Sequence, residues 1–217
     1  MKKLIFFILL LTLVSCGKVN QIAPYNYEAE ISNYSSVHKN VRELPQHLTF
    51  NALNNPSKEN VEELVKALTK DLSSIDDKAR AIHDWIVINI FYDLDRYQPN
   101  GDLYRPYFYL EVLRSRLTMC GGYSDLFFVM AKMAGLRVAS VTGATANAHI
   151  WNAVWDGSEW KHVDATWDAG SYKSKKPTRT YSSNYFFRTA AFMNTVTIHA
   201  DGGGYVYEET QSPYSEF

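Results

Sequence analysis

Three side chains in this sequence have the types and the order that thiol chemistry needs. Cys120 begins a Cys-Gly-Gly-Tyr run, His149 lies in His-Ile-Trp-Asn, and Asp164 lies in His-Val-Asp-Ala-Thr-Trp. A thiolate attacks a carbonyl carbon, an imidazole moves the proton, and a carboxylate holds the imidazole in one tautomer. We therefore predict a catalytic Cys-His-Asp triad.

The sequence around Cys120 predicts that this residue starts a helix. From Gly121 to Ala134 apolar residues recur at helical spacing, and Gly135 is a typical C-terminal stop. The N–H groups and the dipole at a helix start favour the thiolate. Gly121 and Gly122 would let a substrate backbone approach closely and leave N–H groups to hold an oxyanion. The alternative is a buried, inert cysteine.

A hairpin is predicted to bring His149 and Asp164 together. Asp156-Gly157 is typical of a two-residue turn, and strand-like runs flank it at Ile150–Trp155 and Trp160–Asp164. If that turn forms, His149 lies directly opposite Asp164, with Cβ atoms about 4.5–5.5 Å apart on one face. Another loop length would move this register by a residue or two.

The other histidines fit other roles. His162, in the second strand-like run, fits a structural histidine that supports the site. His83 lies within a predicted helix, where packing is favoured over a role as catalytic base. His199 precedes a Gly-rich turn and could line a cleft, whereas His38 and His47 show no pattern.

No metal or other cofactor is expected. Only one thiol remains for a zinc site once Cys16 is assigned to lipid attachment, and the aspartates after the second helix lack the twelve-residue calcium pattern. The formal net charge of −1 gives no basic surface for nucleic acid. Four tryptophans fit core or cleft walls: Trp151, Trp155, Trp160 and Trp167.

The first fifteen residues have the pattern of a targeting signal. Lys2 and Lys3 precede an apolar run, Leu4–Val14, that is shorter than the roughly 20 residues a membrane-spanning helix needs. The Leu-Val-Ser-Cys sequence ending at Cys16 resembles the bacterial lipoprotein signal. That resemblance implies cleavage before Cys16, its acylation, and a lipid anchor in the cell envelope, on the periplasmic or surface face. An ordinary secretory peptide with an incidental cysteine is the alternative.

Composition and periodicity predict one domain of the α+β class, with helices packed on an antiparallel β-sheet. Residues 1–15 are assigned to the signal, 16–45 to a polar lead-in, and 46–217 to the domain, which is long enough to bury a core. Asn60 is the predicted cap of a helix reaching to Leu72, and Ser74 the cap of the next helix. A meander of strands follows.

The motifs together resemble the bacterial transglutaminase-like superfamily over roughly residues 75–170. The resemblance rests on four groups in this order: Ile82-His83-Asp84-Trp85-Ile86 with Asn89-Ile90 and Tyr92-Asp93, Cys120-Gly121-Gly122-Tyr123, Ala148-His149-Ile150-Trp151-Asn152, and His162-Val163-Asp164-Ala165-Thr166-Trp167. It implies a papain-like fold with the cysteine at a helix start and the histidine and aspartate on neighbouring strands. Met119 and Ile150 depart from the Gly-Val lead-in and the His-Ala-Trp-Asn common among bacterial members.

The triad and the resemblance predict acyl chemistry on a peptide or amide carbonyl, with hydrolysis as the leading reaction. The Cys120 N–H would be one oxyanion donor, Tyr92 is a candidate for the second, and Gly121 and Trp151 are placed at the cleft. Two alternatives stay open: a catalytically silent binding or scaffold module, and a protein-glutamine acyltransferase that forms cross-links. The expected partners are a protein or peptide substrate and, through the lipid, a membrane.

Overall fold

Helices from the amino-terminal half pack together, and strands follow in the chain. The computed structural model describes residues 35–95, 108–142, 149–196 and 204–210. The helices of these residues are α2 (Lys39–Arg42), α3 (Gln46–Asn54), α4 (Lys58–Leu68), α5 (Ile75–Asn89), α6 (Tyr109–Ser115), α7 (Cys120–Met133), α8 (Ala165–Asp168) and α9 (Ala190–Asn194). The strands are β1 (Phe91–Asp93), β2 (Leu117–Thr118), β3 (Val138–Thr142), β4 (Ile150–Trp155), β5 (Trp160–Val163), β6 (Ser171–Lys173), β7 (Lys176–Thr178) and β8 (Val206–Glu208). No helix of these ranges has the length and apolar composition to cross a membrane.

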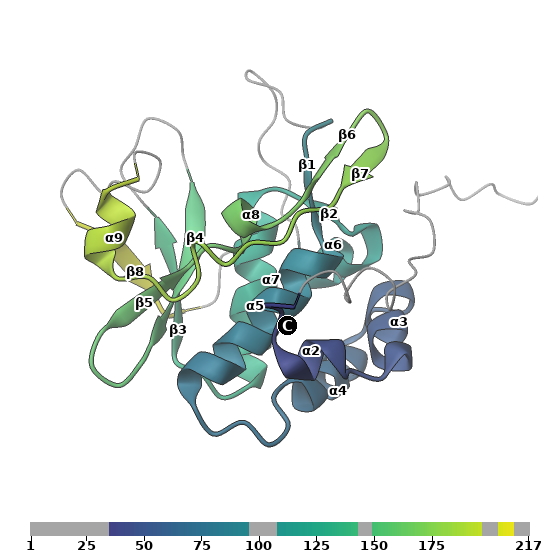
Figure 1. Ribbon diagram of the computed structural model, residues 1–217, viewed down its shortest axis with the longest axis horizontal. Helices are drawn as coiled ribbons and strands as arrows, with labels where there is room; N and C mark the ends of the chain where they lie inside the picture. Colours follow the sequence, from purple (N-terminus) through teal and green to yellow (C-terminus); the bar gives the residue numbers. More distant parts are fainter. Residues whose placement is uncertain (1–34, 96–107, 143–148, 197–203, 211–217) are drawn as a thin grey trace, which may run out of the picture.

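Helix α7 packs on an antiparallel sheet, which confirms the predicted α+β class. The strand order is β5-β4-β3-β8, and each neighbouring pair runs antiparallel. Figure 1 shows this sheet on the left of the molecule, with α5 and α7 in the middle. Val138 and Val154 join the main core with α7, whereas Val141 and Trp151 join a smaller cluster with Met193 of α9. Both faces of the sheet are therefore covered.

A second, mixed sheet lies on the other side of the central helices, at the upper right of Figure 1. Its order is β2-β1-β6-β7, with β1 parallel to both of its neighbours. Gly170 enters this sheet, where its carbonyl accepts the Tyr92 N–H at 2.9 Å. A Cβ at Gly170 would clash with the backbone oxygen of Thr178, so this position requires glycine. The sheet joins β2, which leads into α7, to the segment that follows α8.

The central helix α5 has the buried stripe that its spacing predicts, and Ser74 is its cap as expected. The Ser74 hydroxyl accepts the Asp77 N–H at 3.0 Å. Ile82 and Ile86 have no exposed surface. The core also includes Val37, on the amino-terminal side of the boundary that composition predicts between lead-in and domain. The packed part of the chain therefore starts before residue 46.

The predicted cap of the preceding helix is wrong. Helix α4 begins at Lys58 because the Ser57 hydroxyl accepts the Asn60 N–H at 3.2 Å. The Asn60 side chain lies inside the first turn and donates to the Asn55 carbonyl at 2.7 Å. The helix also ends at Leu68, four residues before the predicted end. Both Ser57 and Asn60 are residue types that cap helices well, so their types alone do not decide between them.

The hairpin between β4 and β5 forms, but its turn is one residue later than predicted. The Asp156 N–H donates to the Glu159 carbonyl at 3.1 Å, so the turn is centred on Gly157-Ser158. The Asp156 carboxylate accepts the N–H groups of Ser158 and Glu159 at 2.8 and 2.9 Å, which fixes this turn. Gly157 has a φ of +109°, a conformation that glycine adopts without strain.

This turn shifts the strand pairing by two positions, so the predicted direct opposition of His149 and Asp164 is wrong. Trp155 pairs with Trp160 and Asn152 with Val163. A shift of two residues returns every side chain to the same face, whereas a shift of one would reverse it. His149 and Asp164 therefore keep a shared face and meet along a diagonal.

The cap assignment predicts a difference between two neighbouring substitutions. Ser57→Ala removes the acceptor at the start of α4 and should lower the free energy of unfolding by about 1 kcal/mol. Asn60→Ala removes a solvent-exposed hydrogen bond and should cost less. Urea denaturation of both variants measures the difference, and a larger loss in Asn60→Ala would contradict the assignment.

Candidate active site

Cys120 is the first residue of α7 and is partly exposed. It is the one cysteine in the described ranges and forms no disulfide there. The first N–H groups bonded within the helix are those of Gly122 and Tyr123, both to the Met119 carbonyl at 3.1 Å. The N–H groups of Cys120 and Gly121 come before them, at the end of the helix where donors have no partner within it. The predicted helix start at Cys120 is confirmed.

Open space adjoins the thiol at Gly121. Apart from its chain neighbours and its own helix backbone, a Cβ built on Gly121 would meet no atom of the described ranges within 4 Å. The N–H groups of Cys120 and Gly121 precede the helical hydrogen bonds and are the candidates to donate to an oxyanion.

His149 and Asp164 form a short hydrogen bond. His149 Nε2 lies 2.6 Å from Asp164 Oδ2, and the two residues are 7% and 0% exposed. The contact that the sequence predicts between the two side chains is present, although their register differs. His149 directly precedes β4 and Asp164 directly follows β5, so the hairpin determines how far apart they lie.

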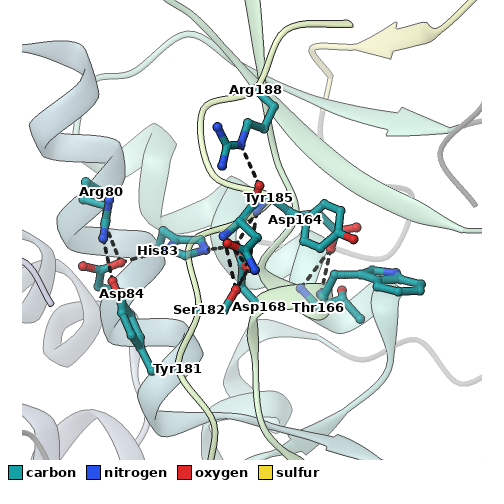
Figure 2. Close-up of polar contacts among 12 residues, drawn as sticks. Arg80, His83, Asp84, Asp164, Thr166, Asp168, Tyr181, Ser182, Tyr185 and Arg188 are labelled. Carbon is teal, nitrogen blue, oxygen red and sulfur yellow. Dashed lines mark hydrogen bonds and ion pairs between the residues drawn. The ribbon is translucent and has the colours of Figure 1, made fainter. Parts of the chain in front are cut away.

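Asp164 also caps the short helix α8, as Figure 2 shows. Its Oδ1 accepts the N–H groups of Thr166 and Trp167 at 2.9 and 3.3 Å, which leaves Oδ2 for His149. The backbone N–H of Asp164 donates to the Tyr185 carbonyl at 3.0 Å. The start of α8 therefore holds the carboxylate, and the bond to Tyr185 holds the backbone of the same residue.

The environment of His149 favours the charged imidazole. Burial lowers its pKa, but the negative charge of Asp164, the hydrogen bond to Asp164 and the hydrogen bond to Cys120 outweigh burial and raise the pKa to about 10. Nε2 is bonded to Asp164, so Nδ1 is the ring nitrogen that remains for the thiol. An imidazole in this position can take the proton of the Cys120 thiol, as the base beside a thiol nucleophile does. The structure thus brings the three predicted residues into one constellation.

Trp151 packs beside the imidazole and does not offer its N–H to the cleft. Its ring stacks on His149 with centroids 5.5 Å apart, and its indole N–H donates to His162 Nδ1 at 2.9 Å. His162 is fully buried, and its Nε2 lies 3.0 Å from the Tyr207 hydroxyl. Trp151 therefore packs against His149, and His162 lies behind it, bonded to the indole N–H.

Tyr92 lies on β1 near a buried tyrosine that the sequence did not single out. Tyr123 is fully buried, and burial raises its pKa well above 10, with further contributions from the nearby Tyr92 and Asp164. Tyr92 and Asp164 therefore both act on the electrostatics of this hydroxyl. Tyr123 follows Cys120 by three residues on α7, a spacing that puts both on one side of the helix and could have identified it.

The sequence also missed the contacts of His83. It was predicted as a packing residue of α5, but both of its ring nitrogens face carboxylates, Asp84 Oδ1 at 2.9 Å and Asp168 Oδ2 at 3.1 Å. Cys16 and His199 lie outside the described residues. Within the described ranges, no group of three or more His, Cys, Asp or Glu side chains could hold a metal ion.

Comparison with known proteins finds the same region of the chain. Residues 58–165 match the residue pattern of the Transglutaminase-like superfamily. Kyphoscoliosis peptidase of Mus musculus is 30% identical over 144 residues, covering 60% of this chain and 21% of that protein. The Homo sapiens kyphoscoliosis peptidase is 29% identical over 145 residues, with 60% and 22% covered. This chain thus spans about a fifth of the length of these relatives.

A search of solved structures finds, among others, the crystal structure of a TGase. It has a TM-score of 0.39 and 22% identity, and the match covers 64% of this chain and 41% of that one.

Asp164→Asn tests the electrostatics of the constellation. Asparagine keeps an oxygen to cap α8 but removes the charge, so the pKa of His149 should fall well below its value of about 10. In the unchanged protein the pKa of His149 lies above the ordinary 6.5. The charged His149 therefore stabilises the folded state fully below pH 6.5, and this stabilisation is lost as the pH rises toward about 10. NMR titration of the His149 ring measures the shift. An unchanged pKa in Asp164→Asn would contradict this account.

Proposed function

Because residues 58–165 match the Transglutaminase-like superfamily, we propose that this protein is a member of it and a thiol hydrolase of peptide or amide bonds. The observation that carries the proposal is the position of His149, bonded to Asp164 and to Cys120 at the start of α7. The constellation has the three roles of a nucleophile, a proton carrier and an orienting carboxylate. The two curated relatives are named as peptidases, which supports hydrolysis.

In the acylation step, the Cys120 sulfur attacks the carbonyl carbon of the substrate. The tetrahedral oxyanion accepts hydrogen bonds from the N–H groups at the start of α7. The C–N bond then breaks, the amine leaves with the proton of the His149 imidazolium, and a thioester remains on Cys120. Asp164 keeps the imidazole oriented through its 2.6 Å hydrogen bond.

In the deacylation step, His149 takes a proton from water as the water oxygen attacks the thioester carbonyl. The C–S bond breaks, the carboxylic acid is released, and the thiolate–imidazolium pair is restored. An amine in place of water would give transfer and cross-linking instead. Water is favoured as acceptor because its concentration far exceeds that of any amine.

A silent binding module is the competing function. Such a module has no need of a thiol, an imidazole and a carboxylate in one hydrogen-bonded chain. The raised pKa of His149 also depends on the two partners that the chemistry requires. These observations favour the enzyme.

We further propose that the protein is held at a bacterial membrane by acyl chains on Cys16. The support is the apolar run of Leu4–Val14, with Cys16 at the expected cleavage position. A lipid anchor of this kind would place the domain at the periplasmic or outer surface of the cell envelope.

Substitution of Cys120 tests the enzyme directly. Cys120→Ala should lower hydrolysis of labelled casein by at least about 10,000-fold, because removal of a triad member leaves only residual catalysis. His149→Ala should have a similar effect and should slow iodoacetamide labelling of Cys120 at neutral pH, because the imidazolium is lost. His47→Ala is the matched control and should leave both measurements unchanged.

The same variants separate the competing functions. Circular dichroism and thermal unfolding should show that Cys120→Ala stays folded. Equal casein hydrolysis by Cys120→Ala and the unchanged protein would refute the enzyme, and iodoacetamide labelling insensitive to His149→Ala would support the binding module. Incorporation of a fluorescent amine into casein, without release of peptides, would favour transfer over hydrolysis.

Mass spectrometry of the protein from bacterial membranes tests the anchor. The mature chain should begin at an acylated Cys16, and Cys16→Ser should release the protein from the membrane fraction. An unmodified Cys16 in the mature protein would refute the proposal.

A further inference from the structure

A second buried histidine lies between two carboxylates, and Figure 2 shows it bridging α5 and α8. His83 Nδ1 is 2.9 Å from Asp84 Oδ1, and His83 Nε2 is 3.1 Å from Asp168 Oδ2. His83 and Asp84 are 0% exposed and Asp168 is 1% exposed. Buried carboxylates are retained where donors satisfy them, and His83 supplies a donor to each when both of its nitrogens carry protons.

The surroundings of His83 favour this doubly protonated form, because both of its ring nitrogens face carboxylate oxygens. Burial lowers its pKa, but hydrogen bonds to Asp168 and Asp84 and the charges of both outweigh burial and raise it. Arg80 Nε also donates to Asp84 Oδ1 at 2.8 Å, so His83 and Arg80 share this carboxylate. The Phe186 ring packs on the imidazole, with centroids 5.0 Å apart.

The amino-terminal end of this network is fixed by main-chain groups. The His38 N–H donates to Asp84 Oδ2 at 2.7 Å. Arg80 Nη2 donates to the Ser36 carbonyl at 3.1 Å and to the Tyr181 hydroxyl at 2.6 Å. These hydrogen bonds hold the Asp84 carboxylate in place on α5. Asp84 in turn orients His83, whose other ring nitrogen contacts Asp168 of α8.

The other end of the network leads to Asp164. Asp168 accepts from the Ser182 hydroxyl and from the Asn184 N–H, the latter at 2.9 Å, and from the Tyr185 N–H at 3.1 Å. The Tyr185 carbonyl in turn accepts the Asp164 N–H at 3.0 Å. Asp164 and Asp168 also stand at the two ends of α8. Asp168 therefore contacts both neighbours of Asp164: it ends helix α8, and it accepts from the segment around Tyr185.

We propose that His83 is a positioning residue of the site, which acts through Asp168 to hold Asp164 at hydrogen-bonding distance from His149. The proposal rests on the proposed function, since it assigns His83 to the orientation of the same triad. Without the imidazole, Asp168 loses a buried donor and the hydrogen-bonded turn around Tyr185 loosens. Asp164 then moves relative to His149, and the proton carrier is misplaced.

His83→Gln tests the proposal in the full-length protein, because both N–H donors of an amide lie on one nitrogen and cannot span the two carboxylates as the ring does. The pKa of His149, about 10 in the unchanged protein, should fall in an NMR titration. The rate of Cys120 labelling by iodoacetamide at neutral pH should fall by about tenfold or more, as expected for misplaced catalytic groups. Measurements are made well below the melting temperature of each variant.

Two further variants keep the result interpretable. Leu53→Ala in α3, also buried, is the matched control: it should lower the melting temperature but leave the pKa of His149 and the labelling rate unchanged. Ser182→Ala removes one donor to Asp168 near the surface and should change both quantities in the same direction as His83→Gln, by less. It decides the question if His83→Gln does not fold.

The outcomes are distinct for the two proposals. A lower melting temperature in His83→Gln or Ser182→Ala, with the His149 pKa and the labelling rate unchanged as in Leu53→Ala, would mean that the network only stabilises the fold and would overturn the inference. Failure of the unchanged protein to hydrolyse casein refutes the proposed function instead. The His149 titration does not depend on turnover and still decides the role of His83.

Discussion

The two oxygens of the Asp164 carboxylate perform different tasks, and the site depends on that division. Oδ2 accepts from His149, while Oδ1 accepts from the first N–H groups of α8. The helix cap therefore determines the direction of the oxygen that faces the imidazole. Burial alone would lower the pKa of His149, and the charge of Asp164 is the largest of the contributions that raise it. One side chain thus sets the geometry and the electrostatics together.

Local signals predicted the parts of the fold that depend on neighbouring residues. The helix that starts at Cys120 and stops before Gly135 was predicted because its spacing and its glycine belong to one segment. The contact between His149 and Asp164 was predicted although the turn was displaced by one residue. Strand side chains alternate with a period of two, so the resulting two-residue shift preserved the shared face. The contact required only that the register shift be an even number of residues, which keeps both side chains on one face of the sheet.

The remaining features depend on choices that sequence spacing does not make. Ser57 and Asn60 are both suitable caps, and the fold selects Ser57. His83 has the position of a packing residue in α5, and its second partner, Asp168, lies 85 residues further along the chain. The spacing of residues within one helix cannot predict a contact over that sequence separation. Only the packing of α8 against α5 brings the second carboxylate to the imidazole.

The entry of the chain into the fold has a mechanical consequence. Ser36 and His38 are joined by hydrogen bonds to Arg80 and Asp84, the same residues from which His83 reaches α8. A pulling force on the amino-terminal segment would load these bonds together with the packing of Val37 in the apolar core. The contacts that would bear this force continue through His83 to Asp168, and they are the same contacts that we propose align Asp164.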